Sequence, residues 1–198
     1  MRTVLQNDVT KPEIETARLR LRQFTLEDLD SFAAICSDPE VMKYIGAGKS
    51  VSKEEARPHL SGYIDYWEKH GLGRFAVTHK EHGELIGYCG FRLFRYPGLR
   101  LFANKPEIVF LLKKTSWGKG LAAEAARACL RYGFEQKKYP QFVAITRGEN
   151  TASQRVLERI GMKQGKSVHY MEFDCAVYSI LQEEFHPGDF LYILRNPS

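Results

Sequence analysis

The chain has 198 residues, of which 43% are hydrophobic and 27% charged, and 29 Lys and Arg against 24 Asp and Glu give a formal net charge of +5. This length suits one domain, and the apolar fraction is enough for a sizeable core and excludes a disordered chain. The positive charge is compatible with an anionic ligand, a nucleic acid or an acidic membrane surface, and by itself it selects none of them.

Cysteine spacing and hydropathy exclude some of these partners and a metal site. The four cysteines are far apart and form no Cys-x-x-Cys pair, which favours buried reduced thiols over a metal or redox site, so we expect no metal. No run reaches the roughly 18 apolar residues of a membrane span, and the N-terminus lacks the apolar core of a signal peptide. No basic face with interleaved aromatic residues is evident. We therefore expect a cytoplasmic protein without a nucleic-acid or membrane partner.

Periodicity and capping signals predict the elements of the first half of the chain. Two helix starts carry a capping box, in which Ser or Thr is followed three positions later by an acidic residue (Thr25 with Asp28, Ser52 with Glu55). In chain order we expect a strand at 17–24, helices at 26–37, 38–45 and from 53 to about 69, and a hairpin of strands at 73–79 and 84–94.

The second half predicts strands that alternate with helices. Residues 107–112 are almost wholly apolar, as expected for a strand covered on both faces. After a loop at 95–106, the expected order is this strand, a helix at 120–134, a strand at 141–146, a helix from Asn150 to Ile160, and strands near 167–173 and 175–181. The whole order predicts an α/β (α+β) fold with one mixed sheet flanked by helices.

The stretch TSWGKGLAAEA, residues 115–125, places Gly118 and Gly120 where a helix begins. Glycine costs up to about 1 kcal/mol relative to alanine inside a helix, so these positions gain only if something approaches the backbone closely. A Walker A loop is absent, and the loose G-x-G-x-x-A match lacks the strand spacing and the acidic residue of a dinucleotide site. Two interpretations remain, a tight packing turn with solvated lysines or an anion site at a helix N-terminus.

Six segments in order resemble the GCN5-related N-acetyltransferases, and within them the ribosomal-protein-alanine acetyltransferase-like (RimJ/RimL-like) group. They are IETARLRLRQFTLEDLD, DPEVMKYIG, ELIGYCGF, EIVFLLKKTSWGKGLAAEA, ENTASQRVLERIGM and DCAVYSILQEEF. The resemblance implies a splayed mixed sheet of six to seven strands with about four helices. It covers a domain at 14–185, after a polar lead-in at 1–13 and before an extension at 186–198 that either joins the domain or forms a loose tail.

The resemblance also implies acetyl-CoA as cosubstrate. The loop and helix start at Trp117–Ala122 would hold the pyrophosphate through main-chain N–H groups, and the strand at Phe110–Leu112 would lie along pantetheine and supply an oxyanion-binding N–H. Asn150 and Ser153 match the family's N-x-x-S pair, although their spacing alone favours an ordinary N-cap. The implied cosubstrate residues are Phe110, Leu111, Leu112, Trp117, Gly118, Lys119, Gly120, Leu121, Ala122, Asn150 and Ser153.

One departure from the family motif concerns Thr115, which stands where the wider family has Gln or Arg. Our hypothesis is that Lys113 or Lys114 makes the lost contact instead.

Proton transfer is the part of the chemistry for which the sequence leaves alternatives open. Glu107 opens the apolar strand at a position where many family members carry an acid, and burial raising its pKa would suit a general base. The alternative is a strand-end carboxylate in water. Ser153 could donate to the departing thiolate, and Tyr178 is a candidate acid or a core tyrosine. The family's usual acids are absent at Leu157 and Gln164, and His169 is a further candidate or a surface histidine.

The acceptor is expected to be a primary amine, either a protein N-terminus or a small molecule, and the protein a monomer or homodimer. The segments at 38–48 and 167–174 are candidates to shape the acceptor pocket. A different interpretation is an acyl-CoA-binding or sensing domain without catalysis, which the missing acids keep open. The four cysteines lie outside the motif positions assigned a role, which favours direct transfer over an acetyl-enzyme.

Overall fold

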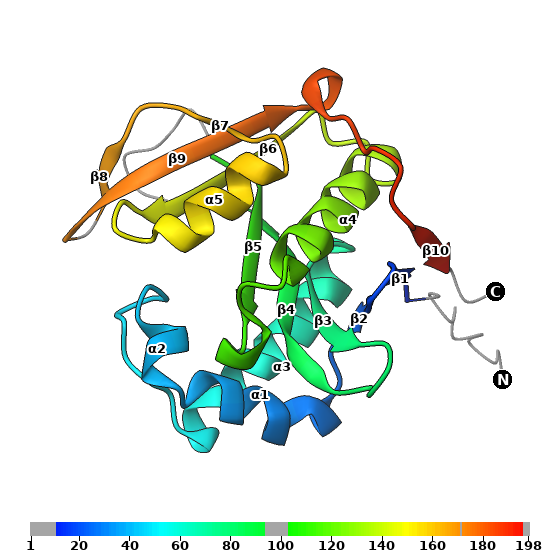
Figure 1. Cartoon of the computed structure of the whole chain (residues 1–198). Helices are drawn as coiled ribbons and strands as arrows, with labels where there is room; N and C mark the ends of the chain where they lie inside the picture. The colour runs from blue at the N-terminus through cyan, green and yellow to red at the C-terminus, as the bar shows by residue number, and fades with distance from the viewer. Residues whose placement is uncertain (1–10, 94–102, 171, 196–198) are drawn as a thin grey trace, which may run out of the picture.

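The computed structural model describes residues 11–93, 103–170 and 172–195, and these form one large mixed sheet with helices on both faces (Figure 1). The strand order is β10-β1-β2-β3-β4-β5-β6-β9-β7, and β8 pairs with β9. The strands are β1 Glu13–Glu15, β2 Leu19–Gln23, β3 Arg74–His79, β4 Leu85–Leu93, β5 Pro106–Leu112, β6 Gln141–Arg147, β7 Lys163–Gln164, β8 Val168–Tyr170, β9 Phe173–Leu181 and β10 Ile193–Arg195. The helices are α1 Leu29–Cys36, α2 Pro39–Met42, α3 Lys53–His70, α4 Leu121–Glu135 and α5 Thr151–Arg159.

The predicted fold class is confirmed, with a sheet larger than the six to seven strands expected. The additional strands β1, β7 and β10 are only two or three residues long. Such short segments show no alternation that a sequence pattern could reveal. The predicted loop at 95–106 lies largely outside the described residues.

Both capping boxes form. The carboxylate of Asp28 accepts from the N–H of Thr25 at 2.9 Å, and a 3-10 turn at Leu26–Asp28 then leads into α1. Ser52 and Glu55 cap α3 reciprocally, through bonds of 3.2 Å and 2.8 Å. Because the cap fixes its first turn, α3 begins at Lys53 even though Pro58 lies inside it.

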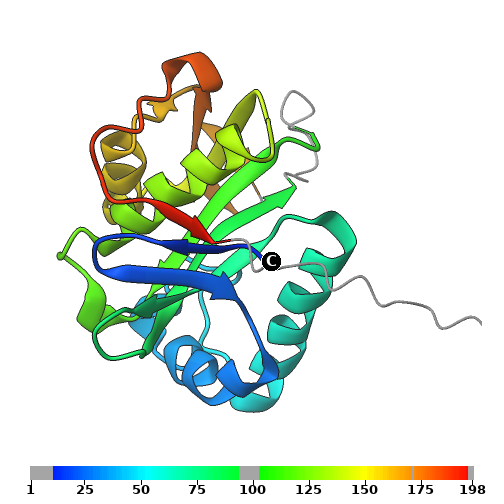
Figure 2. The same ribbon diagram turned by 90° about the vertical axis from the view of Figure 1, so that its right-hand side faces the viewer.

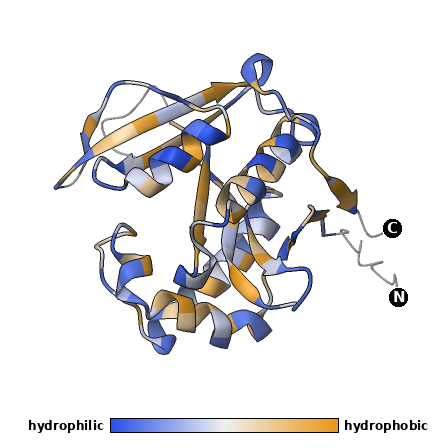
Figure 3. Cartoon of the chain, in the orientation of Figure 1, coloured by the Kyte–Doolittle hydropathy of each residue, from blue (hydrophilic) through white to orange (hydrophobic). Residues whose placement is uncertain are grey.

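Apolar side chains pack on both faces of the sheet, and β5 contributes to both cores. Ile108, Phe110 and Leu112 pack toward α4, while Val109 and Leu111 pack toward α1 and α3. Figure 3 shows β5 and β9 mostly in the colours of hydrophobic residues, whereas the helices mix hydrophilic and hydrophobic residues. This confirms the prediction that the apolar run at 107–112 is a strand covered on both sides.

The sheet splits between β5 and β6. These two strands run parallel, and the only register pair found among the described residues joins Glu107 to Val143. Beyond this pair, Val109 and Phe110 on β5 and the last three residues of β6 are only half-buried. The strands therefore diverge from a vertex at Glu107, as Figure 1 shows, and β5 keeps β4 as its neighbour along its whole length. The predicted splay is present.

The C-terminal segment returns to the N-terminal edge of the sheet. Strand β10 pairs antiparallel with β1, joining Glu13 to Arg195 and Ile14 to Leu194. Figure 2 shows β10, in red, lying beside the blue β1 and β2. The chain after Phe185 therefore adds a strand to the sheet.

Two further sequence expectations can be compared with the structure. All four cysteines are buried and free, which agrees with the expected reduced thiols. Among the described residues, no helix combines the length and the apolar character needed to cross a bilayer.

Candidate functional site

Helix α4 begins without a side-chain cap. Its N-cap is Gly120, with φ +75°, and Gly118 also has a left-handed φ of +72°. No side chain of the described residues caps this start, so its first-turn N–H groups have no capping acceptor. Free N–H groups at the positive end of a helix dipole favour an anion, and the left-handed glycines leave these N–H groups uncovered by side chains.

Two arginines flank this helix start. A Cβ added to Gly120 would lie 3.7 Å from Arg18 Nη2 and 3.8 Å from Arg159 Nη1. Arg18 binds Glu124 through Nε and Nη2, at 2.7 Å and 2.6 Å, and its Nη1 donates to the carbonyl of Lys119 at 2.9 Å. Arg18 thereby fixes the loop to the β1–β2 turn.

Glu124 is held in its charged form. Burial raises the pKa of its carboxyl group, but hydrogen bonds from Thr16 and Arg18 outweigh burial and leave the pKa below its ordinary value. The Thr16 hydroxyl donates at 2.6 Å. Glu124 therefore offsets the charge of Arg18 and orients it beside Gly120.

A pocket of about 520 Å³ opens beside this helix start. Its cations Lys119, Arg127 and Arg159 form no ion pair within the described part of the chain. The lining consists of Ala17, Arg18, Gly118, Lys119, Gly120, Ala123, Glu124, Arg127, Arg159, Phe190 and Leu191. The pocket is thus strongly basic, with an apolar wall from the C-terminal segment.

The hypothesis that Lys113 or Lys114 replaces the missing contact at Thr115 finds little support. Lys113 is paired with Glu84, and Lys114 with Glu40 at 2.6 Å. Both charges are therefore engaged with carboxylates, whereas the cations beside Gly120 come from distant segments.

The predicted strand residues do not all face one way. Phe110 and Leu112 point toward α4, and Leu111 points to the opposite core. The carbonyl of Leu112 accepts from the indole of Trp117 at 2.7 Å, which pins the glycine loop to the end of β5. Side-chain contacts with a ligand in the splay are therefore expected from Phe110 rather than Leu111, while all three contribute main-chain groups.

Asn150 forms the N-cap of α5. Its Oδ1 accepts from the Ser153 N–H at 3.1 Å, as its spacing predicts. The Asn150 NH₂ group and the Ser153 hydroxyl have no hydrogen-bond partner among the described residues. Capping and ligand binding are therefore compatible at this helix start, because the cap uses only the carbonyl oxygen of Asn150.

Glu107 lies buried at the vertex of the splay. Its side chain is 1% exposed and binds the facing Arg92 of β4 through contacts of 2.8 Å and 3.2 Å. The alternative of a strand-end carboxylate in water is therefore wrong. The two contacts with Arg92 fix the position of the Glu107 carboxyl group at the vertex.

Tyr178 lies in the other core. It is fully buried on the α4–α5 face, whereas Glu107 lies on the same face of β5 as Val109 and Leu111, which pack toward α1 and α3. Its hydroxyl faces Glu158 at 3.3 Å and Gln164 at 3.4 Å. Burial, followed by the charge of Glu158, raises the pKa of Tyr178. The structure thus does not bring Tyr178 together with Glu107.

Comparison of the sequence with known proteins identifies the family to which this chain belongs. Residues 18–163 match the family model described as an acetyltransferase (GNAT) domain. The chain belongs to the GNAT acetyltransferase family. The uncharacterized N-acetyltransferase YoaA of Bacillus subtilis (strain 168) is 32% identical over 178 residues, which cover 86% of this chain and 97% of that relative. The uncharacterized protein YkkB of the same strain is 33% identical over 171 residues, covering 85% and 95%.

Solved structures agree with this membership in the GNAT family. An acetyltransferase (GNAT family) from Bacillus anthracis is 31% identical and matches with a TM-score of 0.73, covering 87% of this chain and 99% of that chain. RimL, a ribosomal-protein α-N-acetyltransferase solved with coenzyme A, shares the fold with a TM-score of 0.70 at 16% identity, covering 84% and 95%. The enzyme class is accordingly N-acetyltransferase.

Helix α2 and the loop after it connect the two arms of the GNAT splay. Glu40 binds Lys114, which follows β5, and the carbonyl of Gly46 accepts from Arg147 of β6 at 2.7 Å. The Arg147 guanidinium also stacks on the Phe173 ring, 3.4 Å from its centroid. The segment at 38–48, a candidate for the acceptor pocket, is therefore bonded to the turn that follows β5 and to the end of β6.

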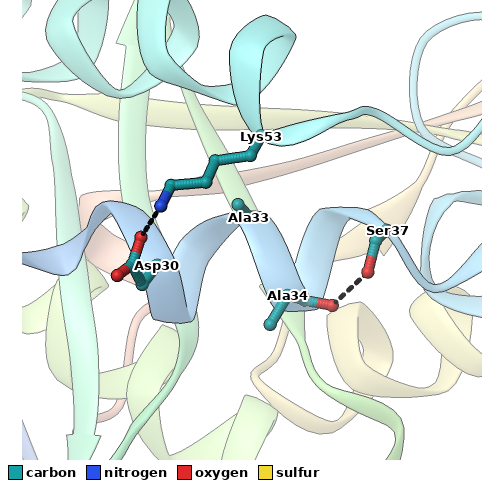
Figure 4. Close-up of a pocket in the computed structure, with 5 residues that line it drawn as sticks. All are labelled: Asp30, Ala33, Ala34, Ser37 and Lys53. Carbon is teal, nitrogen blue, oxygen red and sulfur yellow. Dashed lines mark hydrogen bonds and ion pairs between the residues drawn. The ribbon is translucent and has the colours of Figure 1, made fainter.

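We assign no function to two other features of this GNAT chain, a pocket on α1 and a cluster of possible metal ligands at the β3–β4 turn. A pocket of about 330 Å³ on α1 is lined by Asp30, Ala33, Ala34, Ser37 and Lys53 (Figure 4). Its Lys53 pairs with Asp30 and its Ser37 hydroxyl bonds to the Ala34 carbonyl, so its polar groups are already partnered. His79, Glu81 and His82 bring ligand-type atoms within 4.8 Å of one another at the β3–β4 turn, with Glu81 and His82 exposed.

The sequence analysis missed Arg18, Glu124, Arg159 and Arg147. Arg18 and Glu124 are 106 residues apart, and Arg147 lies 101 residues from Gly46. No local pattern marks such pairs, because each residue alone has the character of an ordinary exposed charge. The one signal in the sequence that could have identified them is that each lies next to a strand end or a helix start that carries a family motif.

Proposed function

We propose that this GNAT enzyme transfers the acetyl group of acetyl-CoA directly to a primary amine within a ternary complex. The observation that carries the proposal is the uncapped start of α4, which follows the carboxyl end of β5, where that strand has no register pair with β6 in the described part of the chain. A helix start of this kind suits a pyrophosphate, and a strand edge can pair with the amides of a pantetheine arm. Coenzyme A joins these two groups in one molecule.

In this proposal the backbone of Trp117–Ala122 holds the pyrophosphate, and the left-handed glycines let phosphate oxygens reach the N–H groups. Pantetheine lies along Phe110–Leu112, on the edge of β5 that faces the diverging β6, because β4 occupies the other edge. The NH₂ group of Asn150 bonds to this arm. A main-chain N–H of β5 binds the acetyl oxygen, already oriented before reaction because it lies on a rigid strand.

The reaction then needs two proton movements. A neutral amine attacks the thioester carbonyl, the C–N bond forms, the C–S bond breaks, and the electron pair of that bond leaves on sulfur. Glu107, directly or through a water, takes the proton that the amine loses. The departing thiol has a pKa of about 8.5. A weak donor such as the Ser153 hydroxyl is therefore sufficient to stabilise the thiolate as it leaves.

Direct transfer is supported by the state of the cysteines. Burial raises the pKa of Cys36 to about 11 and also raises the pKa of Cys129 and Cys175. A thiol that is buried and protonated is a poor nucleophile, and all four cysteines are buried. An acetyl-cysteine intermediate is therefore disfavoured.

The proposal is tested by measuring thiol release from acetyl-CoA with a panel of amines: peptides of varied N-terminal residue, amino acids, polyamines and aminoglycosides. We expect saturable turnover with at least one class, and acetyl-CoA binding in calorimetry. Binding without turnover across the panel would favour the acyl-CoA-sensing alternative. Absence of acetyl-CoA binding would overturn the proposal itself.

A further inference from the structure

A half-buried arginine, Arg74 of β3, lies on the same face of the sheet as Glu107. Arg74 pairs with Gly90 of β4, and Gly90 pairs with Val109 of β5. Because residues directly opposite one another in a sheet point to the same side, Arg74 projects from the face that carries Val109 and Glu107. Gly90 has no side chain, so β4 places none between Arg74 and Val109.

The guanidinium of Arg74 is held by aromatic rings. Its Cζ atom lies 4.3 Å from the ring centroid of Tyr63 on α3 and 5.6 Å from that of Tyr88 on β4. Such cation–π contacts orient an arginine but use none of its N–H donors. Among the described residues the buried Nε has no hydrogen-bond partner, and the side chain has no carboxylate partner. Residues 94–102, which follow β4, contain no Asp or Glu.

A cation in these surroundings suits a substrate carboxylate. A buried donor without an acceptor costs about 1–3 kcal/mol, and more in a charged group. The planar fork of an arginine matches a carboxylate, which accepts two of its donors at once. One guanidinium between two rings fits the single charge of a carboxylate better than the double charge of a phosphate, which normally takes several donors.

One small substrate can reach both Arg74 and the Glu107–Arg92 pair. The Arg92 side chain is 38% exposed, so this part of the face is accessible. Burial, followed by Tyr63, raises the pKa of Tyr88, whereas the charges of Arg74 and Arg92 both lower it, so both guanidinium groups lie within electrostatic range of one hydroxyl. Two strand spacings and two residues separate the Cα atoms of Arg74 and Glu107, which gives about 12 Å, and their side chains extend over much of it.

We propose that Arg74 selects acceptors that carry a carboxylate close to the amine that is acetylated. The amine lies at Glu107, and the carboxylate accepts from the Arg74 donors between the rings of Tyr63 and Tyr88. The carboxylate belongs to a free amino acid or to an acidic residue beside a peptide N-terminus. The inference rests on the proposed transfer to a primary amine and adds the chemical class of the acceptor.

The experiment compares acceptors in matched pairs that differ only in the carboxylate. Thiol release from acetyl-CoA is measured with each of several amino acids against its amide, and with peptides that begin Ala-Asp against peptides that begin Ala-Asn. The two kinds of pair distinguish a free amino acid from a peptide. Values of kcat/KM are expressed per neutral amine, because a neighbouring carboxylate changes the pKa of the amine. In the preferred kind of pair we expect the carboxylate member to react about tenfold or more efficiently.

Variants of Arg74 test whether this residue causes the preference. In Arg74→Gln the ratio within the preferred pair should fall to about twofold or less, while the KM for acetyl-CoA stays close to wild type. Arg74→Lys keeps the charge without the planar fork and should retain a ratio of about threefold. Arg57→Gln, at an exposed position of α3, is the matched control and should keep the wild-type ratio. Circular dichroism checks that each variant is folded.

Three outcomes would overturn the inference and leave the proposed function intact. They are turnover confined to amines without a carboxylate, equal kcat/KM within every pair, and an unaltered ratio in folded Arg74→Gln. If Arg74→Gln does not fold, an unaltered ratio in Arg74→Lys has the same meaning. Absence of turnover with every amine tested would instead overturn the proposed function, and the inference with it.

Discussion

Glu107 and Arg92 face each other across β5 and β4, and their side chains bind through two contacts of 2.8 Å and 3.2 Å at the vertex of the splay. A carboxyl group held in this way is fixed in position before any substrate arrives. Preorganisation of this kind is what a general base needs, because geometry limits proton transfer before acidity does.

The first prediction concerns this carboxylate. Glu107→Gln keeps the shape and a hydrogen bond to Arg92 but cannot take a proton, so kcat should fall by about tenfold or more while acetyl-CoA affinity is retained. Steady-state kinetics and calorimetry measure the two quantities. Glu68→Gln, at an exposed position of α3, is the control. A pH–rate profile of the Glu107 variant that matches the wild type would remove Glu107 from the mechanism.

The second prediction concerns the helix start. Gly120→Leu should abolish measurable acetyl-CoA binding, because the new side chain stands over the N–H groups of α4 between Arg18 and Arg159. The left-handed φ adds strain of about 1–2 kcal/mol. Gly83→Leu carries the same kind of strain, at φ +66° and with nothing within 4 Å of its Cβ, so it reports strain alone. If Gly120→Leu bound acetyl-CoA as well as Gly83→Leu does, this stretch would be only a packing turn.

The third prediction separates structure from catalysis at Tyr178. Tyr178→Phe removes a buried hydroxyl that faces Glu158, Gln154 and Gln164. We expect the free energy of unfolding to fall by about 1 kcal/mol, while kcat changes by less than about threefold. Urea unfolding and steady-state kinetics check the pair of values. A loss of kcat as large as that in the Glu107 variant would return Tyr178 to the role of general acid.

The fourth prediction concerns the contact between Arg147 and the loop after α2. Arg147→Met breaks the bond to the Gly46 carbonyl and loosens the segment that we place at the acceptor side. The KM for the amine should rise by about fivefold, with the KM for acetyl-CoA nearly unchanged. Arg57→Met controls for loss of a surface charge. Equal increases in both KM values would place this contact on the cosubstrate side instead.

The fifth prediction follows from the lowered pKa of Glu124. A carboxyl group with a lowered pKa in the folded state contributes stability above its ordinary pKa, and the contribution is lost as pH falls through the lowered value. Glu124→Gln should therefore reduce the free energy of unfolding by about 2 kcal/mol at neutral pH. The difference from wild type should shrink steadily below the ordinary pKa of 4.5. Urea unfolding across this pH range measures it, and a gap independent of pH would rule out the ionic contribution.

Local signals in the sequence were sufficient for much of the fold. The capping boxes at Thr25 and Ser52 and the apolar run of β5 each depend on neighbouring residues, and each is present in the structure. The glycines at the start of α4 were equally visible. Short strands such as β7 and β10 were not, because their partners, and not their own residues, make them strands.

The electrostatic parts of the site could not be read from the chain in the same way. Glu107 was identified from its position, but the pairing with Arg92 depends on the register between β4 and β5. The arginines around Gly120 come from the β1–β2 turn and from the end of α5. Their convergence is a property of the folded sheet. At Glu124, burial raises the pKa, and hydrogen bonds from Thr16 and Arg18, which sequence spacing does not reveal, outweigh that effect.

The pairing of β10 with β1 has a consequence for the solubility of this chain. A sheet that ended at β1 would leave the outer N–H and C=O groups of that strand free to pair with another molecule. The three-residue β10 occupies this side of β1 and carries Arg195 at its end, and a short charged strand is a poor template for further pairing. Removal of the residues after Phe185 would therefore expose the unpaired edge of β1. We expect such a shortened protein to aggregate before it loses activity.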